Sequence, residues 1–128
     1  MEKMIIGIGT DIIEISRVEK AVNNTSSFIS KFFTHEEITY FESVRFKAET
    51  LAGTFAAKEA VAKALGTGFR EFGLKDIEVL RDSLGKPYVN CLGKAQKLCT
   101  DKNIDKIHVS IAHCKDYAVA YAIAEGSD

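Results

Sequence analysis

Three parts of the chain carry strand-like patterns in which β-branched or large apolar residues dominate or alternate with smaller ones. They are residues 5–15, the pair 77–80 and 87–89, and the pair 107–112 and 118–124. Each pair flanks a short polar segment, which predicts an antiparallel hairpin. In the last strand large apolar residues alternate with alanines only. This pattern predicts that a tightly packed helix, or another chain, covers the alanine face.

The segments between the strands show helical signals. Residues 47–65 are rich in alanine, lack proline and end before Gly66, which predicts the central helix of the fold. Four shorter helices are expected: from Ser16 to about Val22, over residues 28–33, from Thr34 onward, and over residues 94–101. The helices at Ser16 and Thr34 are each marked by a capping box, with Glu19 and Glu37 three residues later.

The order of elements is therefore strand, helices, hairpin, helix, hairpin. It lacks the strand–helix–strand alternation typical of parallel sheets. The sequence predicts an α+β fold in which a mainly antiparallel sheet is wrapped around one long central helix. The length of 128 residues fits a single domain over residues 1–128.

Composition excludes several classes of function. A net charge of −1 argues against general electrostatic binding to nucleic acid or to an anionic membrane. No apolar run is long enough to span a membrane, and no secretory signal is expected. Cys91, Cys99 and Cys114 are odd in number and lack metal-binding spacing, so disulfides and zinc are poor interpretations. Three free thiols favour a reducing, cytoplasmic location.

Two carboxylates stand out for chemistry. Asp11 follows a Gly-x-Gly pair in an apolar strand, although a carboxylate accepting backbone amides at a strand end is an equal alternative. Glu59 lies four residues after Phe55, on the inward stripe of the central helix, and a buried carboxylate needs a partner. That partner is Lys58, Lys63 or a metal ion. The alternative is an exposed Glu59–Lys63 pair worth about 0.3 kcal/mol.

Two further features have simple structural explanations. His113 closes a strand at a turn, where a histidine is more often a surface residue than a ligand. The segment 66–68 is explained as a helix C-cap that needs no ligand. Asp11 and Glu59 together suit Mg²⁺, which keeps several waters and shares substrate phosphate oxygens. The residues alone therefore indicate a magnesium-dependent phosphate enzyme.

The motifs taken together resemble the holo-[acyl-carrier-protein] synthase family, the short bacterial type of 4′-phosphopantetheinyl transferase. The matching stretches cover nearly the whole chain in family order: GIGTDIIEISRV at 7–18, FTHEE at 33–37, LAGTFAAKEAVAKALGTG at 51–68, DIEVLRDSLGKPYV at 76–89 and HVSIAHCKDYAVAYAIAE at 108–125. The resemblance implies transfer of 4′-phosphopantetheine from coenzyme A to a serine of apo acyl carrier protein. The by-product is adenosine 3′,5′-bisphosphate, and the pathway is fatty acid biosynthesis.

The resemblance also implies roles for individual residues. Asp11 and Glu59 match the carboxylates that hold Mg²⁺, and Lys63 matches the lysine that serves the coenzyme A phosphates; these three are the expected catalytic residues. The others match binding positions: Gly66, Thr67 and Gly68 beside the pantetheine and phosphates, His113 near the nucleotide end, and Arg17 toward the acidic carrier protein. A metal-bound water is the preferred group to remove the serine proton, and Asp11 or Glu59 acting through that water is the alternative.

Two positions depart from the family pattern. Thr54 stands where the family usually has arginine, which removes a guanidinium that could bind a phosphate bidentately. Lys58, Arg45 or Lys47 could substitute for it. Ala112 replaces a serine, which is expected to be the smaller loss.

The resemblance predicts a homotrimer with coenzyme A in clefts between subunits, where the Asp11–Glu59 site of one chain meets the His113 region or a hairpin of the next. Two other functions share some of these features. A small magnesium-dependent pyrophosphatase would use the carboxylate pair without a carrier protein, and a module that binds coenzyme A without transfer would be compatible with Thr54.

Overall fold

The computed structural model describes residues 2–66 and 72–127. The elements in chain order are β1 Met4–Glu14, α1 Ile15–Asn24, α2 Phe28–Phe32, α3 His35–Ser43, α4 Ala48–Ala64, a 3₁₀ turn η1 Leu74–Asp76, β2 Ile77–Arg81, β3 Pro87–Cys91, α5 Gly93–Asp101, β4 Ile104–His113 and β5 Tyr117–Gly126.

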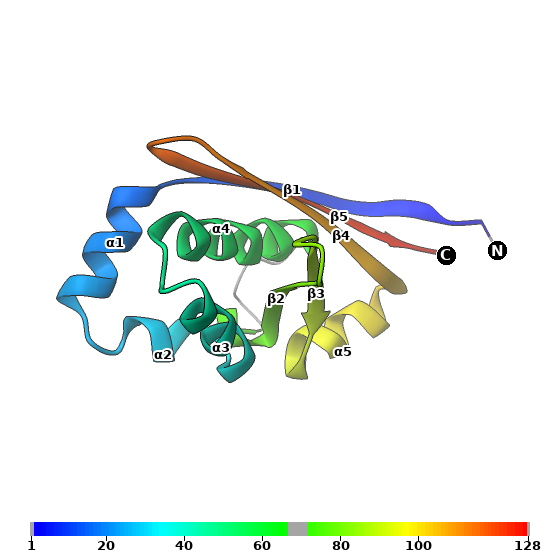
Figure 1. Cartoon of the computed structure of the whole chain (residues 1–128). Coiled ribbons are helices and arrows are strands. Elements are labelled where there is room, and N and C mark those ends of the chain that lie inside the picture. The colour runs from blue at the N-terminus through cyan, green and yellow to red at the C-terminus, as the bar shows by residue number, and fades with distance from the viewer. Residues whose placement is uncertain (1, 67–71, 128) are drawn as a thin grey trace.

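The strands form two antiparallel sheets rather than one. The larger has the order β1-β5-β4, and β2 and β3 form a separate hairpin. Figure 1 shows the three-stranded sheet as one layer, with α4 lying directly against it, α1 beside one end of α4, and α2, α3 and α5 farther from the sheet. The predicted α+β class and the long central helix are confirmed.

The alanine face of β5 packs against α4. Ala118, Ala120, Ala122 and Ala124 are all buried. On the neighbouring strand a Cβ at Gly7 would lie 1.9 Å from the carbonyl oxygen of Ala64, and one at Gly9 would lie 2.0 Å from that of Ala60. Because glycine and alanine are so small, the backbones of sheet and helix come into contact. The sequence left open whether a helix or another chain covers the alanine face, and in the structure the helix α4 covers it.

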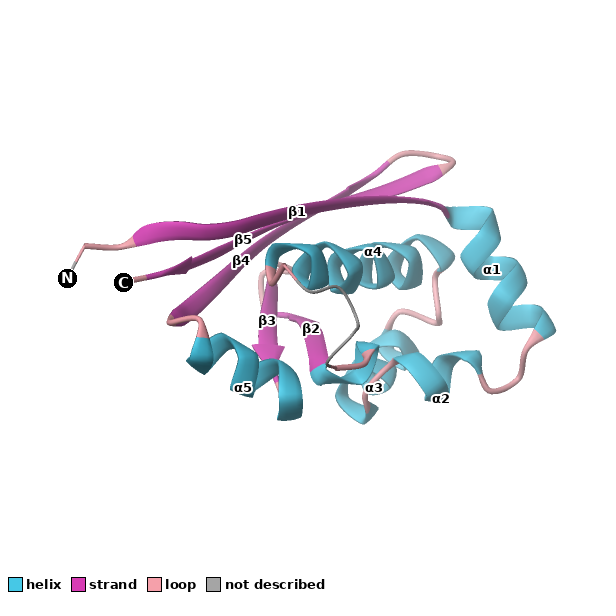
Figure 2. Ribbon diagram, turned by 180° about the vertical axis from the view of Figure 1, so that it is seen from behind, coloured by secondary structure: helices cyan, strands magenta, loops and turns pink. Residues whose placement is uncertain are grey.

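The opposite face of this sheet is uncovered by the part of the chain that the structure describes. Figure 2 shows all the helices on one side of the three strands. We call the bare side the outer sheet face. Its large side chains include Ile8, which is 70% exposed, and Tyr121, which is 60% exposed. Ile8 lies directly opposite Ile123 in the register, so these side chains form a continuous apolar surface.

A buried ion pair joins α4 to α3. Lys58 Nζ lies 2.6 Å from Glu37 Oε1, and both side chains are 0% exposed. The ammonium also donates to the carbonyl oxygens of Phe32 and Leu74, at 3.1 and 2.9 Å. The Glu37 carboxylate accepts from two backbone amides as well, so the pair is fully hydrogen-bonded. This network ties three segments to the central helix.

One of the two predicted capping boxes forms. Thr34 accepts from the backbone of Glu37, and the Glu37 side chain accepts from the backbone of Thr34, as expected. The box at Ser16 is wrong, because α1 begins one residue earlier, at Ile15. The backbone N–H of Ile15 donates instead to the carbonyl oxygen of Asp116 in the β4–β5 turn, at 2.9 Å. A tertiary contact thus replaces the local cap. This helix also extends to Asn24, beyond the expected end.

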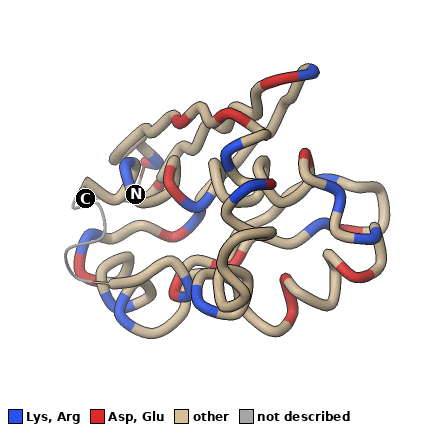
Figure 3. Tube along the Cα trace, turned by 90° about the vertical axis from the view of Figure 1, so that its left-hand side faces the viewer, with Lys and Arg blue, Asp and Glu red and all other residues tan. Residues whose placement is uncertain are grey.

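Charges of both signs are interspersed along the chain in the view of Figure 3. None of the helices in the described ranges combines the length and the hydropathy that a membrane span requires.

Candidate functional site

Asp11 and Glu59 line one pocket of about 400 Å³. In β1 every second residue faces α4, so Asp11 shares the inner face with Gly7 and Gly9. Because the two glycines let β1 approach α4 closely, Asp11 comes to lie beside α4. Glu59 belongs to this helix, and its side chain is half-buried. The Gly-x-Gly-x-Asp spacing therefore places a carboxylate of the strand beside a carboxylate of the helix.

Of the two carboxylates at this pocket, Asp11 has a basic partner and Glu59 has none among the described residues. Lys63 Nζ donates to the carbonyl oxygen of Thr10 at 2.9 Å and lies 3.2 Å from Asp11 Oδ1. Within the described residues the side chain of Glu59 has no hydrogen bond or ion pair. Burial raises the pKa of Glu59, and the nearby Asp11 raises it further, while Lys63 acts in the opposite direction. Of the three expected partners of Glu59, neither Lys58 nor Lys63 forms the ion pair.

Arg17 lines the same pocket from the first turns of α1, and Phe28 and Phe55 form its apolar wall. The guanidinium is on an exposed residue at the rim. A basic group at the mouth of an acidic pocket can meet an acidic partner that approaches from solvent. The structure thus brings Asp11, Glu59, Lys63 and Arg17 together.

The helix α4 ends just before Gly66, as the sequence predicted. Gly66 has a φ of +85° and its N–H donates to the carbonyl oxygen of Lys63 at 3.0 Å, which is typical of a glycine C-cap. Thr67 and Gly68 lie outside the described residues. The proposed role of all three in binding pantetheine or phosphate stays a prediction.

His113 lies in a second pocket of about 210 Å³, together with Arg81 from β2. Arg81 Nη1 donates to Thr54 Oγ1 at 3.0 Å. Thr54 and Glu59 are five residues apart on α4, which places them about 140° apart around the helix axis. The two pockets therefore lie on different flanks of α4, and the structure does not bring His113 into the carboxylate pocket of its own chain.

One of the three substitutes expected for the missing arginine, Lys58, is wrong, while Arg45 and Lys47 stay predictions. Lys58 is unable to bind a phosphate because it is fully buried and paired with Glu37. The guanidinium beside position 54 comes from Arg81, which the sequence did not single out. The available signal was its place at the end of a strand, two residues after the buried Val79.

A bound metal would depend on few protein ligands. No group of three or more His, Cys, Asp or Glu side chains in the described ranges could hold an ion. Two carboxylates on one pocket, one of them unpartnered, do fit Mg²⁺, which uses one or two carboxylates plus waters and substrate phosphates.

Residues 7–122 match the profile of the 4′-phosphopantetheinyl transferase superfamily. The chain belongs to this superfamily. The transferase is 57% identical, over 122 residues, to the holo-[acyl-carrier-protein] synthase of Clostridium beijerinckii, an alignment that covers 95% of this chain and 98% of that relative. The expected family and the class of enzyme are confirmed.

Solved structures of similar proteins share the fold of the transferase. The holo-[acyl-carrier-protein] synthase of Helicobacter pylori in complex with coenzyme A matches with a TM-score of 0.80 at 30% identity, over 91% of this chain and 98% of that chain. The acyl carrier protein synthase of Plasmodium yoelii with ADP bound matches with a TM-score of 0.89 at 37% identity, over 100% of both chains.

Proposed function

We propose that the transferase moves the 4′-phosphopantetheine group of coenzyme A to a serine of apo acyl carrier protein, with the reaction centred on the Asp11–Glu59 pocket. The observation that carries this proposal is the pairing of carboxylates from β1 and α4 in one pocket, with Lys63 beside them. The names of the relatives and the coenzyme A complex of the Helicobacter pylori protein support the substrates.

Asp11 and Glu59 would hold a Mg²⁺ ion in this proposal. When bound, the ion would neutralise the pyrophosphate charge that otherwise repels the incoming serine hydroxyl, and it would stabilise the leaving group. The unpartnered carboxylate of Glu59 and the raised pKa that Asp11 and burial cause support a site built for a cation, because a bound positive charge would relieve the repulsion between the two.

Lys63 orients one of these carboxylates. Its ammonium lies between the carbonyl oxygen of Thr10 and the carboxylate of Asp11, so it holds Asp11 toward the pocket. More than half of the Lys63 side chain is exposed, which leaves donors free for a phosphate oxygen on the same side. Phe28 and Phe55 also line the pocket, and their apolar rings would exclude water from that part of it.

The function is tested by incubating the protein with coenzyme A, Mg²⁺ and apo acyl carrier protein, followed by mass spectrometry of the intact carrier protein. We expect a gain of one phosphopantetheine group. A carrier protein that stays unmodified while coenzyme A is hydrolysed at its pyrophosphate would favour a pyrophosphatase. Binding of coenzyme A without any reaction would favour a non-catalytic module.

Arg17→Glu is expected to raise the KM for acyl carrier protein about tenfold, with little change in the KM for coenzyme A. The exposed guanidinium at the rim meets the acidic protein first, and such charges act mainly on the encounter rate. Steady-state kinetics at low and high salt check this, because the difference from wild type should shrink as salt screens the charge. Lys20→Met, on an exposed residue of the same helix, is the control. Equal damage to both KM values would place Arg17 inside the coenzyme A site.

The transferase would act as a homotrimer in this proposal, with coenzyme A between neighbouring subunits. The outer sheet face supports the assembly, since a monomer rarely exposes so large an apolar surface. The separation of the two pockets on different flanks of α4 also supports it. Cyclic packing would place the carboxylate pocket of one subunit near the His113 pocket of another.

Tyr121→Asp is expected to convert the trimer to a monomer and to abolish transfer, although Tyr121 performs no chemistry. A charge buried at a subunit interface without a partner costs several kcal/mol. Light scattering at micromolar concentration together with the transfer assay checks the result, and Val119→Asp on the same strand should behave alike. A wild-type protein that is monomeric and fully active would contradict the prediction.

We also propose a cytoplasmic location. The three cysteines are odd in number and lack metal-binding spacing, which favours free thiols and a reducing compartment.

A further inference from the structure

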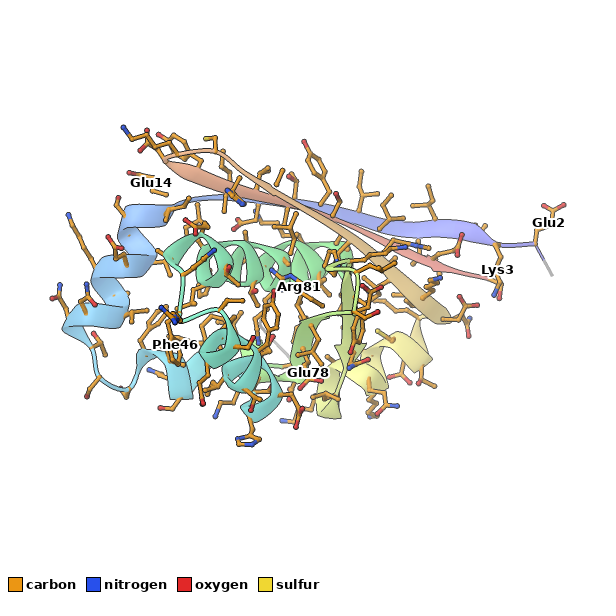
Figure 4. All side chains as sticks on the ribbon, viewed as in Figure 1. Glu2, Lys3, Glu14, Phe46, Glu78 and Arg81 are labelled. Carbon is orange, nitrogen blue, oxygen red and sulfur yellow. The ribbon has the colours of Figure 1, made fainter. Side chains whose placement is uncertain are left out.

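The side chain of Arg81 crosses from β2 to the central helix. Figure 4 shows it next to α4, on the side of the helix away from the three-stranded sheet. One guanidinium nitrogen donates to Thr54 Oγ1 at 3.0 Å, and the group lies over the ring of Tyr40, 5.5 Å from its centroid. Thr54 is fully buried, so its hydroxyl is a fixed acceptor. Two neighbours from two different helices therefore hold the guanidinium in one place.

This guanidinium carries a charge that its surroundings leave unbalanced. Among residues 2–66 and 72–127 no carboxylate forms an ion pair with Arg81. The nearby carboxylate of Glu37 is already bound to Lys58 and to two backbone amides. Burial lowers the pKa of Arg81, yet a guanidinium remains charged at any physiological pH. A half-buried cation without a counter-ion is costly, and an anionic ligand would remove that cost.

The space beside the guanidinium has the composition of an anion site. Its pocket of about 210 Å³ is lined by Arg81 and by His113 from the end of β4. By liquid volume this equals roughly seven waters, which is enough for a phosphate group with some hydration. One acidic side chain, Glu49, also lines the pocket, and it forms no ion pair with a described basic residue. The free N–H donors of Arg81 suit two oxygens of one phosphate.

We propose that Arg81, positioned by Thr54, is a specificity-determining residue that binds a phosphate monoester of the nucleotide substrate beside His113. The inference rests on the proposed function, because coenzyme A carries such a phosphate on its ribose in addition to its pyrophosphate. The carboxylate pocket is already assigned to the pyrophosphate, and the Arg81 pocket lies on a different flank of α4. The ribose phosphate is the remaining anion of that substrate.

This assignment explains how the chain tolerates threonine at position 54. The hydroxyl of Thr54 is too short to reach a ligand on its own and instead orients a guanidinium that arrives from β2. The phosphate-binding group is thus supplied by the hairpin, and the helix supplies its support.

The test measures equilibrium binding of coenzyme A and of dephospho-coenzyme A, which lacks the ribose phosphate, by calorimetry on the assembled protein. Arg81→Met is expected to weaken coenzyme A about 10- to 100-fold, as expected for loss of charge-assisted hydrogen bonds, and to change dephospho-coenzyme A less than about twofold. Thr54→Val keeps the shape but removes the acceptor, and should weaken coenzyme A alone by about threefold. Lys86→Met removes an exposed charge from the same hairpin and should alter neither ligand.

Equal weakening of both nucleotides in Arg81→Met would show that Arg81 only supports the fold, and unchanged binding of both would show that it has no role; either result overturns the inference. A wild-type protein that binds the two nucleotides equally also overturns it, while leaving transfer of phosphopantetheine intact. The transfer assay on the same samples separates this outcome from a failure of the proposed function.

Discussion

Glu59→Gln is expected to reduce transfer of phosphopantetheine by at least about 100-fold while leaving the protein folded. The substitution removes one of the two anionic groups in the pocket and so weakens the cation site, whose contribution to phosphoryl transfer is several kcal/mol. The fold should tolerate the change because the side chain of Glu59 makes no hydrogen bond or ion pair within the described residues. Single-turnover transfer assays over a series of Mg²⁺ concentrations measure the loss.

The raised pKa of Glu59 adds a second readout. A carboxyl group whose pKa is higher in the folded protein than in the unfolded chain costs stability once the pH exceeds its ordinary value. Glu59→Gln should therefore be at least as stable as wild type at pH 7. The difference in free energy of unfolding between variant and wild type should be more favourable to the variant at pH 7 than at pH 4.

Glu42→Gln, on an exposed residue of α3, is the matched control and should leave transfer unchanged. Wild-type activity of Glu59→Gln at ordinary Mg²⁺ would show that Glu59 is only a charge on the helix. A protein that loses activity and unfolds at the same time would show that the residue is structural.

Lys58→Met is expected to destabilise the fold by about 3–5 kcal/mol, because it leaves Glu37 buried without its counter-ion. It also removes the donor from the carbonyl oxygens of Phe32 and Leu74. Urea unfolding followed by circular dichroism measures the loss. Lys97→Met, on an exposed residue of α5, is the control and should change the free energy of unfolding by less than about 0.5 kcal/mol.

The pH dependence of this variant has a definite sign. Burial raises the pKa of Glu37 and Lys58 lowers it, so removing Lys58 raises the pKa of Glu37 further. A raised carboxyl pKa gives stability that is present at low pH and lost as the pH rises through it. The loss caused by Lys58→Met should therefore be smaller at pH 5 than at pH 8. A loss that is independent of pH would mean that packing of the lysine stem, rather than its charge, stabilises the fold.

The sequence predicted what depends on local patterns. Alanine content and the glycine stop located α4 to within one residue at each end, and the box at Thr34 formed because its partners are three residues apart. The cap at Ser16 failed because a carbonyl from residue 116, far along the chain, takes the place of the cap. The division into two sheets depends on strand pairing, which no local window contains.

The candidate site shows the same division. Asp11, Glu59 and Lys63 could be grouped from spacing on a strand and a helix. In the structure Asp11 and Glu59 line one pocket, and Lys63 Nζ lies 3.2 Å from Asp11 Oδ1. Lys58 pairs with Glu37 of α3 and not with Glu59, and this pairing could not be predicted from the spacing on α4 alone. One signal did indicate that Lys58 is buried: it follows the buried Leu51 by seven residues, which is two helical turns. Arg81 was missed because its importance comes only from its contact with Thr54.

The pairing of β1 with β5 has a consequence for the order of events during synthesis. Residues 4–14 are made first, yet their neighbours in the sheet are residues 117–126. Asp11 lies opposite Ala120, so the strand that carries this carboxylate has no partner in the sheet until more than one hundred further residues have left the ribosome. Such long-range contacts make folding slow, and the glycine-rich strand stays unpaired meanwhile. A ribosome that stalls before β5 should release a chain with an open strand edge, a natural target for chaperones and proteases.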